Sequence, residues 1–452
     1  MSQTLNPSPT FLSRQWQPYP SYKRSGVEWL GEVPEHWEVR KLKFASPSSS
    51  EKLTGKPEEL TYVGLENLES KTGRLLLGSP TEDIDSIVSV FCPGDVLFGK
   101  LRPYLGKVFY SDFLGICTGE LMVLRPVSEV MDGKYLAYLL LSDSFIGLVD
   151  STTYGAKMPR ANPNEILNIQ ICRPSLDEQK QIARFLDRET TRIDTLITKK
   201  RQLIALLQKK RDAIIYEAVT KGIDDQLLIS QGVGFDWCWN VSKEWDVVRL
   251  KFIAGVQTGL TLGKDYKNRT VVSRPYLRVA NVQDGFLDLS EITEIEIPSE
   301  DVSRYELKTR DVLMTEGGDF DKLGRGYVWE GQIEGCLHQN HVFAVRPHAK
   351  YLDSHYLSAI MTSYYGKAYF TSTSQQTTNL ATTNSTKLGN FPLPLPSINQ
   401  QDEILRELDS KLSKLFSVIN KLNEQIGYMQ KHRLSLITAA VTGKIDVREE
   451  VN

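Results

Sequence analysis

The chain has little of what marks a secreted or membrane protein. Only five cysteines occur in 452 residues, scattered and without a Cys-x-x-Cys pair, so reduced thiols are expected and no disulfide framework is indicated. No apolar run is long enough to cross a bilayer, and the N-terminal residues are polar and rich in proline and serine, unlike a signal peptide. These absences predict a cytoplasmic protein that does not engage a membrane.

The chain also has no marked excess of charge of either sign. The formal net charge is −2, with 40% hydrophobic and 24% charged residues, the composition of an ordinary globular protein with two or more cores. A near-neutral average does not identify a nucleic-acid binder. It leaves room for one, because acidic helices elsewhere can balance a basic face.

Motifs for catalysis are missing as well. Asn162–Glu165 begins like the Asn-Pro-Pro-Tyr loop of adenine methyltransferases but lacks the aromatic residue that stacks on a flipped base. Gly259–Lys264 is one residue short of a phosphate-binding loop and continues with Asp265 where a hydroxyl residue should bind magnesium. His338 and His341 have the spacing of metal ligands, but no third ligand is near in sequence. We therefore expect this chain to have no catalytic activity of its own.

What the chain does have is an internal repeat. Gly26–Phe44 aligns without a gap on Gly234–Phe252, and both copies end in Ala-Val-Thr, at residues 218–220 and 440–442. Solenoid units run to about 20–50 residues, so a period this long indicates a duplicated domain. A duplicated domain suggests a protein that engages two related targets. No carboxylate pair with a lysine, as in a nuclease site, recurs in both copies.

Each copy reads as a globular head followed by a long helix. Turn residues separate short runs of β-formers in the heads, which predicts mixed α/β units that are mostly strands. The predicted strands are Leu60–Leu65, Val96–Phe98, Leu121–Leu124, Pro275–Ala280, Asp311–Thr315 and His341–Val345, and the predicted short helices are Tyr135–Ser142 and Tyr356–Ser363.

The long helices begin at two Ser-x-x-Glu/Gln capping boxes, Ser175–Glu178 and Ser397–Gln400. Apolar residues then recur with a heptad period, which predicts an antiparallel coiled coil. The fold class is therefore α+β: a tandem duplication of a strand-rich head plus a long helix, with pseudo-two-fold symmetry. The stripe comprises Leu186, Ile193, Ile197, Ile204, Leu207 and Ile214, interrupted by Lys200, and then Leu408, Leu412, Leu415, Ile419, Leu422, Ile426, Met429 and Leu436.

The predicted domain boundaries follow from these changes in pattern. They are a flexible N-terminal arm (1–25), a first head (26–174), a first spacer helix (175–222), a linker with the start of the second repeat (223–242), a second head (243–396), a second spacer helix (397–446) and a tail (447–452).

The chain resembles the specificity subunit of type I restriction-modification systems at three places. The first is Lys23–Trp37, with its Gly-Val-Glu-Trp-Leu-Gly-Glu-Val-Pro-Glu-His-Trp core. The other two are the helix starts Pro-Ser-Leu-Asp-Glu-Gln and Pro-Ser-Ile-Asn-Gln-Gln. The resemblance runs from about Tyr22 to Val447. The second opening departs from it, with Trp239 in place of the glycine and Ser242 in place of the proline.

The resemblance implies that each head is a target-recognition domain reading one half of a bipartite, asymmetric sequence in double-stranded DNA. The helices would fix the gap between the halves. It implies a non-catalytic chain of a bacterial or archaeal cytoplasm that docks two methyltransferase subunits and two restriction/translocase subunits in defence against foreign DNA. No cofactor is expected in this chain, whereas S-adenosylmethionine, ATP and magnesium are expected on the partner subunits.

The residues themselves agree with this interpretation, since the copies share apolar and turn residues but differ in polar loops. Arginine and lysine bind guanine edges or phosphates, and asparagine and glutamine bind adenine edges. The candidate DNA-binding residues are Lys100, Arg102, Lys107, Lys157, Arg160 and Asn162 in the first head, and Lys264, Arg325, Gln339, Asn340, His341, Asn379, Thr383 and Asn384 in the second.

Two other interpretations stay open at this point. One is a two-headed coiled-coil scaffold that binds no DNA, and the basic loop residues of the first head argue against it. The other is a fused methyltransferase or nuclease, which is disfavoured because the heads and helices occupy the whole length and carry no cofactor loop.

Overall fold

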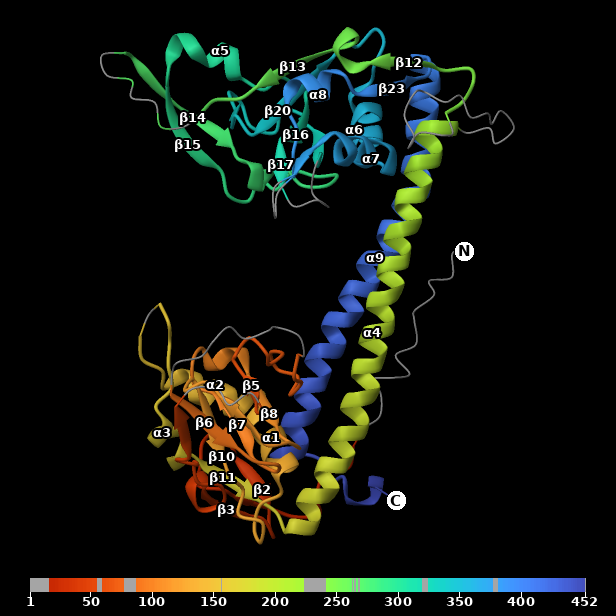
Figure 1. Ribbon diagram of the computed structural model, residues 1–452. Helices are drawn as coiled ribbons and strands as arrows, with labels where there is room; N and C mark the ends of the chain where they lie inside the picture. Colours follow the sequence, from red (N-terminus) through yellow and green to blue (C-terminus); the bar gives the residue numbers. More distant parts are fainter. Residues whose placement is uncertain are drawn as a thin grey trace. The chain divides into compact units, whose positions relative to one another are not determined.

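The computed structural model describes residues 16–54, 59–76, 87–155, 157–222, 241–261, 263, 266, 269–318, 324–376 and 381–451. The chain forms two compact units, Met1–Arg201 with Asn423–Asn452, and Gln202–Leu422. Each unit contains one head and parts of the two long helices α4 (Leu176–Lys221) and α9 (Ile398–Val441) (Figure 1). None of the described helices has the length and apolar character needed to cross a bilayer.

The first head is built from small sheets covered by short helices. Its central sheet has the order β10-β7-β8 and is antiparallel, and a second sheet has the order β4-β6-β9-β5, with β5 and β9 parallel. The bounds are β4 (Lys52–Thr54), β5 (Thr61–Val63), β6 (Ile87–Phe91), β7 (Val96–Gly99), β8 (Val108–Tyr110), β9 (Gly115–Cys117), β10 (Leu121–Leu124), α1 (Gly133–Leu141), α2 (Asp143–Ser151) and α3 (Pro163–Asn168).

Two further strand pairs frame this head. Strands β1 (Tyr22–Arg24) and β2 (Glu32–Pro34) form a hairpin, and β3 (Glu38–Lys41) pairs with β11 (Gln170–Arg173), the strand that leads into α4. Residues 16–25, expected as part of a flexible arm, instead pack on the unit. Tyr19 is buried, and its hydroxyl donates to Glu178 at 2.9 Å.

The second head repeats this plan, with an additional small sheet among its described residues. Strands run in the orders β13-β20-β16-β18, β15-β14-β19 and β17-β22-β21, and β12 pairs with β23 ahead of α9. The bounds are β12 (Asp246–Arg249), β13 (Ala254–Thr258), β14 (Val271–Leu277), β15 (Thr293–Pro298), α5 (Val302–Tyr305), β16 (Val312–Thr315), β17 (Gly317–Gly318), β18 (Gly326–Val328), β19 (Leu337–His338), β20 (Val342–Pro347), α6 (Ser354–Thr362), α7 (Tyr364–Thr373), β21 (Gln375–Gln376), β22 (Ala381–Thr382), α8 (Ser385–Gly389) and β23 (Pro392–Leu395).

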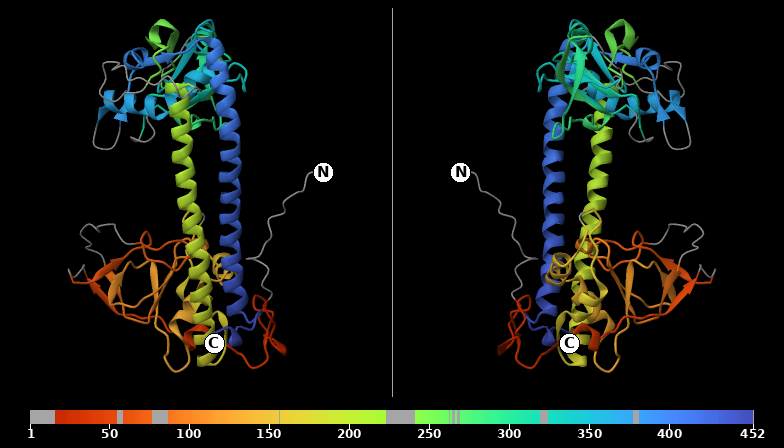
Figure 2. Two further views of the ribbon diagram at one scale, coloured as in Figure 1. Left: turned by 90° about the vertical axis from the view of Figure 1, so that its right-hand side faces the viewer. Right: turned by 90° about the vertical axis from the view of Figure 1, so that its left-hand side faces the viewer.

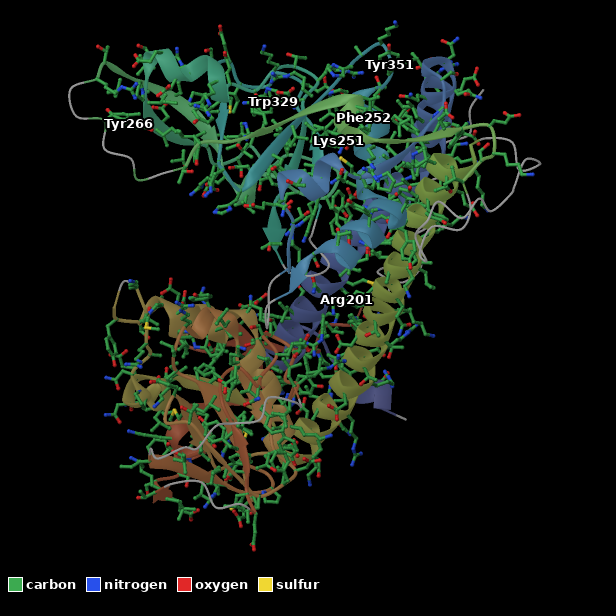
Figure 3. The ribbon with its side chains drawn as sticks, turned by 45° about the horizontal axis from the view of Figure 1, so that its top comes forward. Arg201, Lys251, Phe252, Tyr266, Trp329 and Tyr351 are labelled. Carbon is green, nitrogen blue, oxygen red and sulfur yellow. The ribbon has the colours of Figure 1, made fainter. Side chains whose placement is uncertain are left out.

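The repeat extends to individual contacts. A buried aspartate before the central strand pairs with an arginine at the end of the neighbouring strand in both heads: Arg125 Nη2 lies 2.9 Å from Asp95, and Arg346 Nη2 lies 2.7 Å from Asp311. An exposed phenylalanine also recurs, with the preceding lysine 5.4 Å from its ring centroid, at Lys43–Phe44 and at Lys251–Phe252. Figure 3 labels the second of these pairs. The two heads are therefore copies of one scaffold.

The predicted capping box is complete at the start of α9, whereas at the start of α4 only half of it forms. At α9, Ser397 and Gln400 exchange hydrogen bonds as a complete capping box, with the Gln400 side chain accepting from the Ser397 amide at 3.0 Å. At α4, the Glu178 amide bonds Ser175 at 3.3 Å, but the Glu178 carboxylate turns inward to Tyr19 and to the indole of Trp37 at 3.1 Å. That carboxylate ties the segment before the first head to the helix start.

Within each unit α4 and α9 lie side by side and run antiparallel, because each unit holds the N-terminal part of one and the C-terminal part of the other (Figure 2). Most of the predicted heptad residues are buried or half-buried. Lys200, which interrupts the stripe, donates to the Gln425 side chain of the facing helix at 2.6 Å. The helix α9 ends at Val441, five residues before the predicted limit of 446, because Gly443 adopts a left-handed φ of +71°.

Candidate nucleic-acid interface

Three loops of the first head meet beyond the end of β7. The Lys100 amide donates to the Glu120 carbonyl at 3.0 Å, and the Ala161 amide donates to the Lys100 carbonyl at 2.9 Å. The Arg102 amide donates to the Pro159 carbonyl at 2.8 Å. Backbone bonds thus hold the loop after β7, the turn before β10 and the segment before α3 as one surface.

That surface carries cations and exposed aromatic or apolar side chains together. Arg102 and Lys157 are exposed, and Arg160 is exposed while its guanidinium contacts the Glu120 carboxylate at 3.2 Å. Tyr104, Tyr154 and Met158 lie on the same loops with large exposed fractions. These three residues are not among those predicted from the sequence. Their signal was an aromatic or thioether side chain within a basic, glycine-punctuated loop.

The second head joins the same three segments with the same backbone bonds. The Glu316 amide donates to the His341 carbonyl at 2.9 Å, and the Thr383 amide donates to the Glu316 carbonyl at 2.8 Å. Gly317 pairs with Thr382 in β17 and β22, as Leu101 pairs with Arg160 in the first head. Glu316 therefore occupies the position of Lys100, His341 that of Glu120, and Thr382 that of Arg160.

The polar groups on this shared backbone are rearranged between the heads. In the first head the carboxylate of Glu120, on the turn before β10, contacts Arg160. In the second head the carboxylate comes from the loop after the central strand, and Glu316 lies 2.6 Å from Nδ1 of His341 on the turn. Equal backbone geometry with different donors and acceptors is what two modules need to read different base edges.

Several predicted site residues serve the loops themselves. Asn162 and Asn384 cap the helices α3 and α8, accepting from the amides of Asn164 and Lys387, each at 2.9 Å. Both asparagine side chains are engaged in capping at equivalent positions of the two heads, so each one helps to fix the loop that precedes its helix.

Lys107 and Arg325 are likewise structural equivalents. Each follows a left-handed glycine, and their backbone carbonyls accept hydrogen bonds from the amides of Gly99 and Thr315 at the ends of β7 and β16. Lys107 Nζ donates to the Leu68 carbonyl, and burial lowers the pKa of this amine. Arg325 Nη1 donates to the Gln283 side chain at 2.8 Å. The cationic groups of Lys107 and Arg325 therefore bind other parts of their own heads and stabilise the loops from within the protein.

Of the remaining candidates, Gln339 and Asn340 lie on the turn before β20, Thr383 directly follows β22, and two lie outside the described residues. Gln339 accepts from the Val279 amide at 3.3 Å, and Asn340 Nδ2 is 3.3 Å from the His341 ring. Thr383 is buried, and its hydroxyl makes no hydrogen bond within the described protein. Lys264 and Asn379 lie outside the described residues.

His338 and His341, which have the spacing of metal ligands, lie in different environments. His338 is fully buried, with Nδ1 2.6 Å from the Val342 carbonyl, and burial lowers the pKa of its ring. His341 is exposed and engaged with Glu316. Within the described ranges no group of three or more His, Cys, Asp or Glu side chains is arranged to hold a metal ion.

The two heads thus belong to the class of duplicated recognition modules that share a scaffold and differ in their polar loops. The family model described as type I restriction modification DNA specificity domain matches residues 89–206 and 242–428, one match beginning in each copy. The chain belongs to the family of type I restriction-modification DNA specificity proteins.

Named relatives agree with this family. The type I restriction enzyme MjaVIII specificity subunit of Methanocaldococcus jannaschii is 25% identical over 427 residues, which covers 92% of this chain and 94% of the relative. A 25% identical match of 204 residues to the MjaX specificity subunit of the same organism spans only 46% of that protein. A solved chain from a study of complex assembly and conformational transition of the type I R-M system has a TM-score of 0.64 at 20% identity, covering 90% of this chain and 98% of that one. This last likeness shows the same fold.

Proposed function

We propose that this chain is the DNA-reading subunit of a type I restriction-modification complex, with one head for each half of a bipartite, asymmetric target. The observation that carries the proposal is the exchange of polar groups on a common backbone, Lys100, Glu120 and Arg160 in one head against Glu316, His341 and Thr382 in the other. A scaffold that only held two identical partners would have no need of different loops at the same place.

The chain itself acts without catalysis in this proposal. Its residues bind and orient DNA, while two methyltransferase subunits and two restriction/translocase subunits dock on it in the cytoplasm. In this proposal S-adenosylmethionine, ATP and magnesium are bound by those partner subunits.

Methylome sequencing tests the proposal directly. The chain is expressed with the methyltransferase subunit of its own cell in a host that lacks adenine methylation, and modified adenines are mapped. We expect one bipartite motif with an unspecified spacer. Replacing residues 243–396 by the corresponding head of a relative should change one half of the motif and leave the other. A change in both halves, or no motif, contradicts the division of labour.

The scaffold interpretation has its own test. The complex is passed over immobilised duplex DNA at low and at high salt, because phosphate contacts by the basic loop of the first head make retention strongly salt-dependent. Passage without retention at either salt concentration favours the scaffold.

A further inference from the structure

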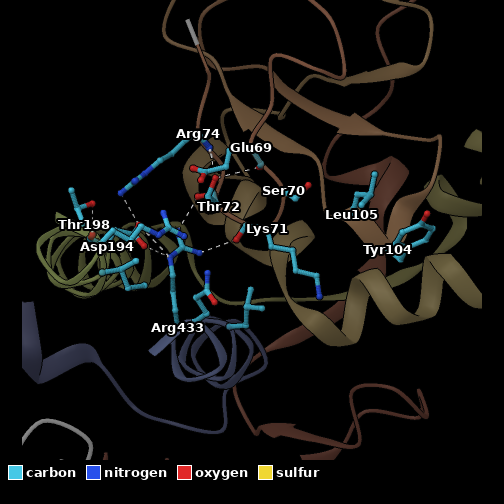
Figure 4. Close-up of a pocket in the computed structure, with 14 residues that line it drawn as sticks. Glu69, Ser70, Lys71, Thr72, Arg74, Tyr104, Leu105, Asp194, Thr198 and Arg433 are labelled. Carbon is cyan, nitrogen blue, oxygen red and sulfur yellow. Dashed lines mark hydrogen bonds and ion pairs between the residues drawn. The ribbon is translucent and has the colours of Figure 1, made fainter. Parts of the chain in front are cut away.

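A buried arginine joins the helix pair to the first head. Arg433 of α9 is only 5% exposed, and its guanidinium donates to the carbonyls of Lys71 and Thr72 at 3.0 and 2.9 Å. Its Nε lies 3.2 Å from the carboxylate of Asp194 on α4, which also binds Arg74 at 2.8 Å. Arg433 and Asp194 border a pocket of about 330 Å³ between the helices and the loop of residues 69–74 (Figure 4).

The loop held by Arg433 also holds the base-reading loop. The Lys71 amide donates to the Gly106 carbonyl at 3.0 Å, and Lys107 Nζ donates to the Leu68 carbonyl. Gly106 closes the turn that begins at Arg102 and contains Pro103–Leu105. A continuous path of hydrogen bonds therefore leads from Arg433 through residues 68–72 to the loop that carries Arg102 and Tyr104.

The contact is tight on both sides. Lys71 adopts a left-handed φ of +60°, and a Cβ added at Gly106 would come within 3.0 Å of the Lys71 side chain and 2.8 Å of Ile146. The loop after β7 therefore has little freedom to shift unless residues 69–74 shift with it. Arg433 fixes that loop against the helices with two carbonyls and one carboxylate, a geometry that suits the planar guanidinium fork.

The second head has a counterpart. Arg211 of α4 stands seven residues before Ala218, as Arg433 stands seven before Ala440. Arg211 lies 3.7 Å from Asp284 in the corresponding loop, and the next residue, Gly285, donates its amide to the Gly326 carbonyl at 3.3 Å. Each head is thus contacted by an arginine from the long helix that follows the other head in the sequence. The contact of Arg211 is the weaker of the two, because its guanidinium also binds Asp212 on its own helix at 2.7 Å.

We propose that Arg433 is a positioning residue that transmits the placement of the helix pair to the base-reading loop of the first head, with Arg211 in the same role for the second. The inference rests on the proposed DNA-reading function. Loss of Arg433 should therefore reduce base discrimination in the half-site read by the first head, while the other half-site is read as before.

The test uses the full chain in complex with its methyltransferase subunits and duplexes substituted one base at a time in each half of the mapped motif. Arg433→Met should lower discrimination at least tenfold in the first half-site only, Arg433→Lys should retain part of it, and Arg211→Met should affect the second half-site. Arg406→Met is the matched control, because Arg406 is an exposed arginine of α9 that bonds Asp402 on the same helix at 2.8 Å. Unchanged discrimination by Arg433→Met, or equal loss in both half-sites, overturns the proposal.

Hydrogen exchange on Arg433→Lys covers the case in which Arg433→Met does not fold. Lysine keeps the charge but cannot span both carbonyls, so amides of residues 68–72 and 102–106 should exchange several-fold faster, with those of the second head unchanged. Unaltered exchange in these segments refutes the path. Failure of the proposed function itself would be recognised separately, since the parent complex would then show no base discrimination at all.

Discussion

The Tyr135 hydroxyl donates to the Val441 carbonyl at 3.2 Å, although 306 residues separate them in the chain. In the second head the Tyr356 hydroxyl reaches the Val219 carbonyl at 3.3 Å. Burial raises the pKa of both phenols well above the usual range, so both remain donors. Each head therefore secures the last turn of the long helix that follows the other head, and the two repeats are interlocked as well as duplicated.

Removing the Tyr356 hydroxyl should weaken this attachment. Tyr356→Phe leaves the buried carbonyls of Val219 and Pro394 without that donor, and we expect the free energy of unfolding to fall by about 1 kcal/mol. Urea titration followed by circular dichroism measures the change. Tyr428→Phe, at an exposed position on α9, is the control. Equal stability of the two variants would contradict the role of the hydroxyl.

The long helices and several strands were predictable because their signals are local. The capping boxes and the heptad stripe gave the start of α4 and α9 within one residue, and the predicted strand Leu121–Leu124 coincides with β10. The second short helix of each head, α2 and α7, was missed. Ser142 and Ser363 each end one helix and cap the next, so no loop separates the two helices and the change of direction has no signal in composition.

The site was predictable only in part, because side-chain type does not fix side-chain direction. Lys107 and Arg325 were predicted to bind DNA because they are cationic, yet both side chains donate to groups within their own heads. Arg433 was not chosen at all, since its partners are mainly backbone carbonyls more than 360 residues away in the sequence. In contrast, the correspondence of Arg160 with Thr382 was predictable from the alignment of the two repeats, and the strand pairing agrees with it.

The buried cysteines should resist alkylation in the folded chain. Burial raises the pKa of Cys117, Cys172 and Cys336 to about 12, and only the thiolate reacts. With iodoacetamide at about pH 8, the half-buried Cys92 should be labelled first and these three only after unfolding in guanidinium, as read by peptide mass spectrometry. Labelling of any of the three at the rate of Cys92 would show that its surroundings open readily. Cys238 lies outside the described residues.

Acid should destabilise the second head through His338. Burial holds the pKa of this ring below its ordinary value of 6.5, so the unfolded chain binds the proton more readily. The stabilisation is complete above about pH 6.5 and is lost as the pH falls toward the folded pKa. Between about pH 7 and 5, the free energy of unfolding of His338→Gln should fall less steeply than that of the parent. His432→Gln on α9 is the control, and parallel slopes for parent and His338→Gln would refute the assignment.

Arg160 distinguishes base reading from phosphate binding in the first head. Its guanidinium is exposed and held by Glu120, so it can be presented to DNA at little conformational cost. If it reads a guanine edge, Arg160→Ala should weaken binding by about 1–3 kcal/mol and relax only the first half-site.

If Arg160 instead neutralises a phosphate, binding should fall for every sequence and the slope of log K against log salt should shrink by about one. Fluorescence anisotropy of the complex over a salt series separates the two results. Arg40→Ala on β3, which removes another exposed arginine paired with a glutamate, is the matched control. An Arg160→Ala complex that binds and methylates like the parent at every salt concentration would remove this loop from the interface, because neither a base contact nor a phosphate contact would then depend on Arg160.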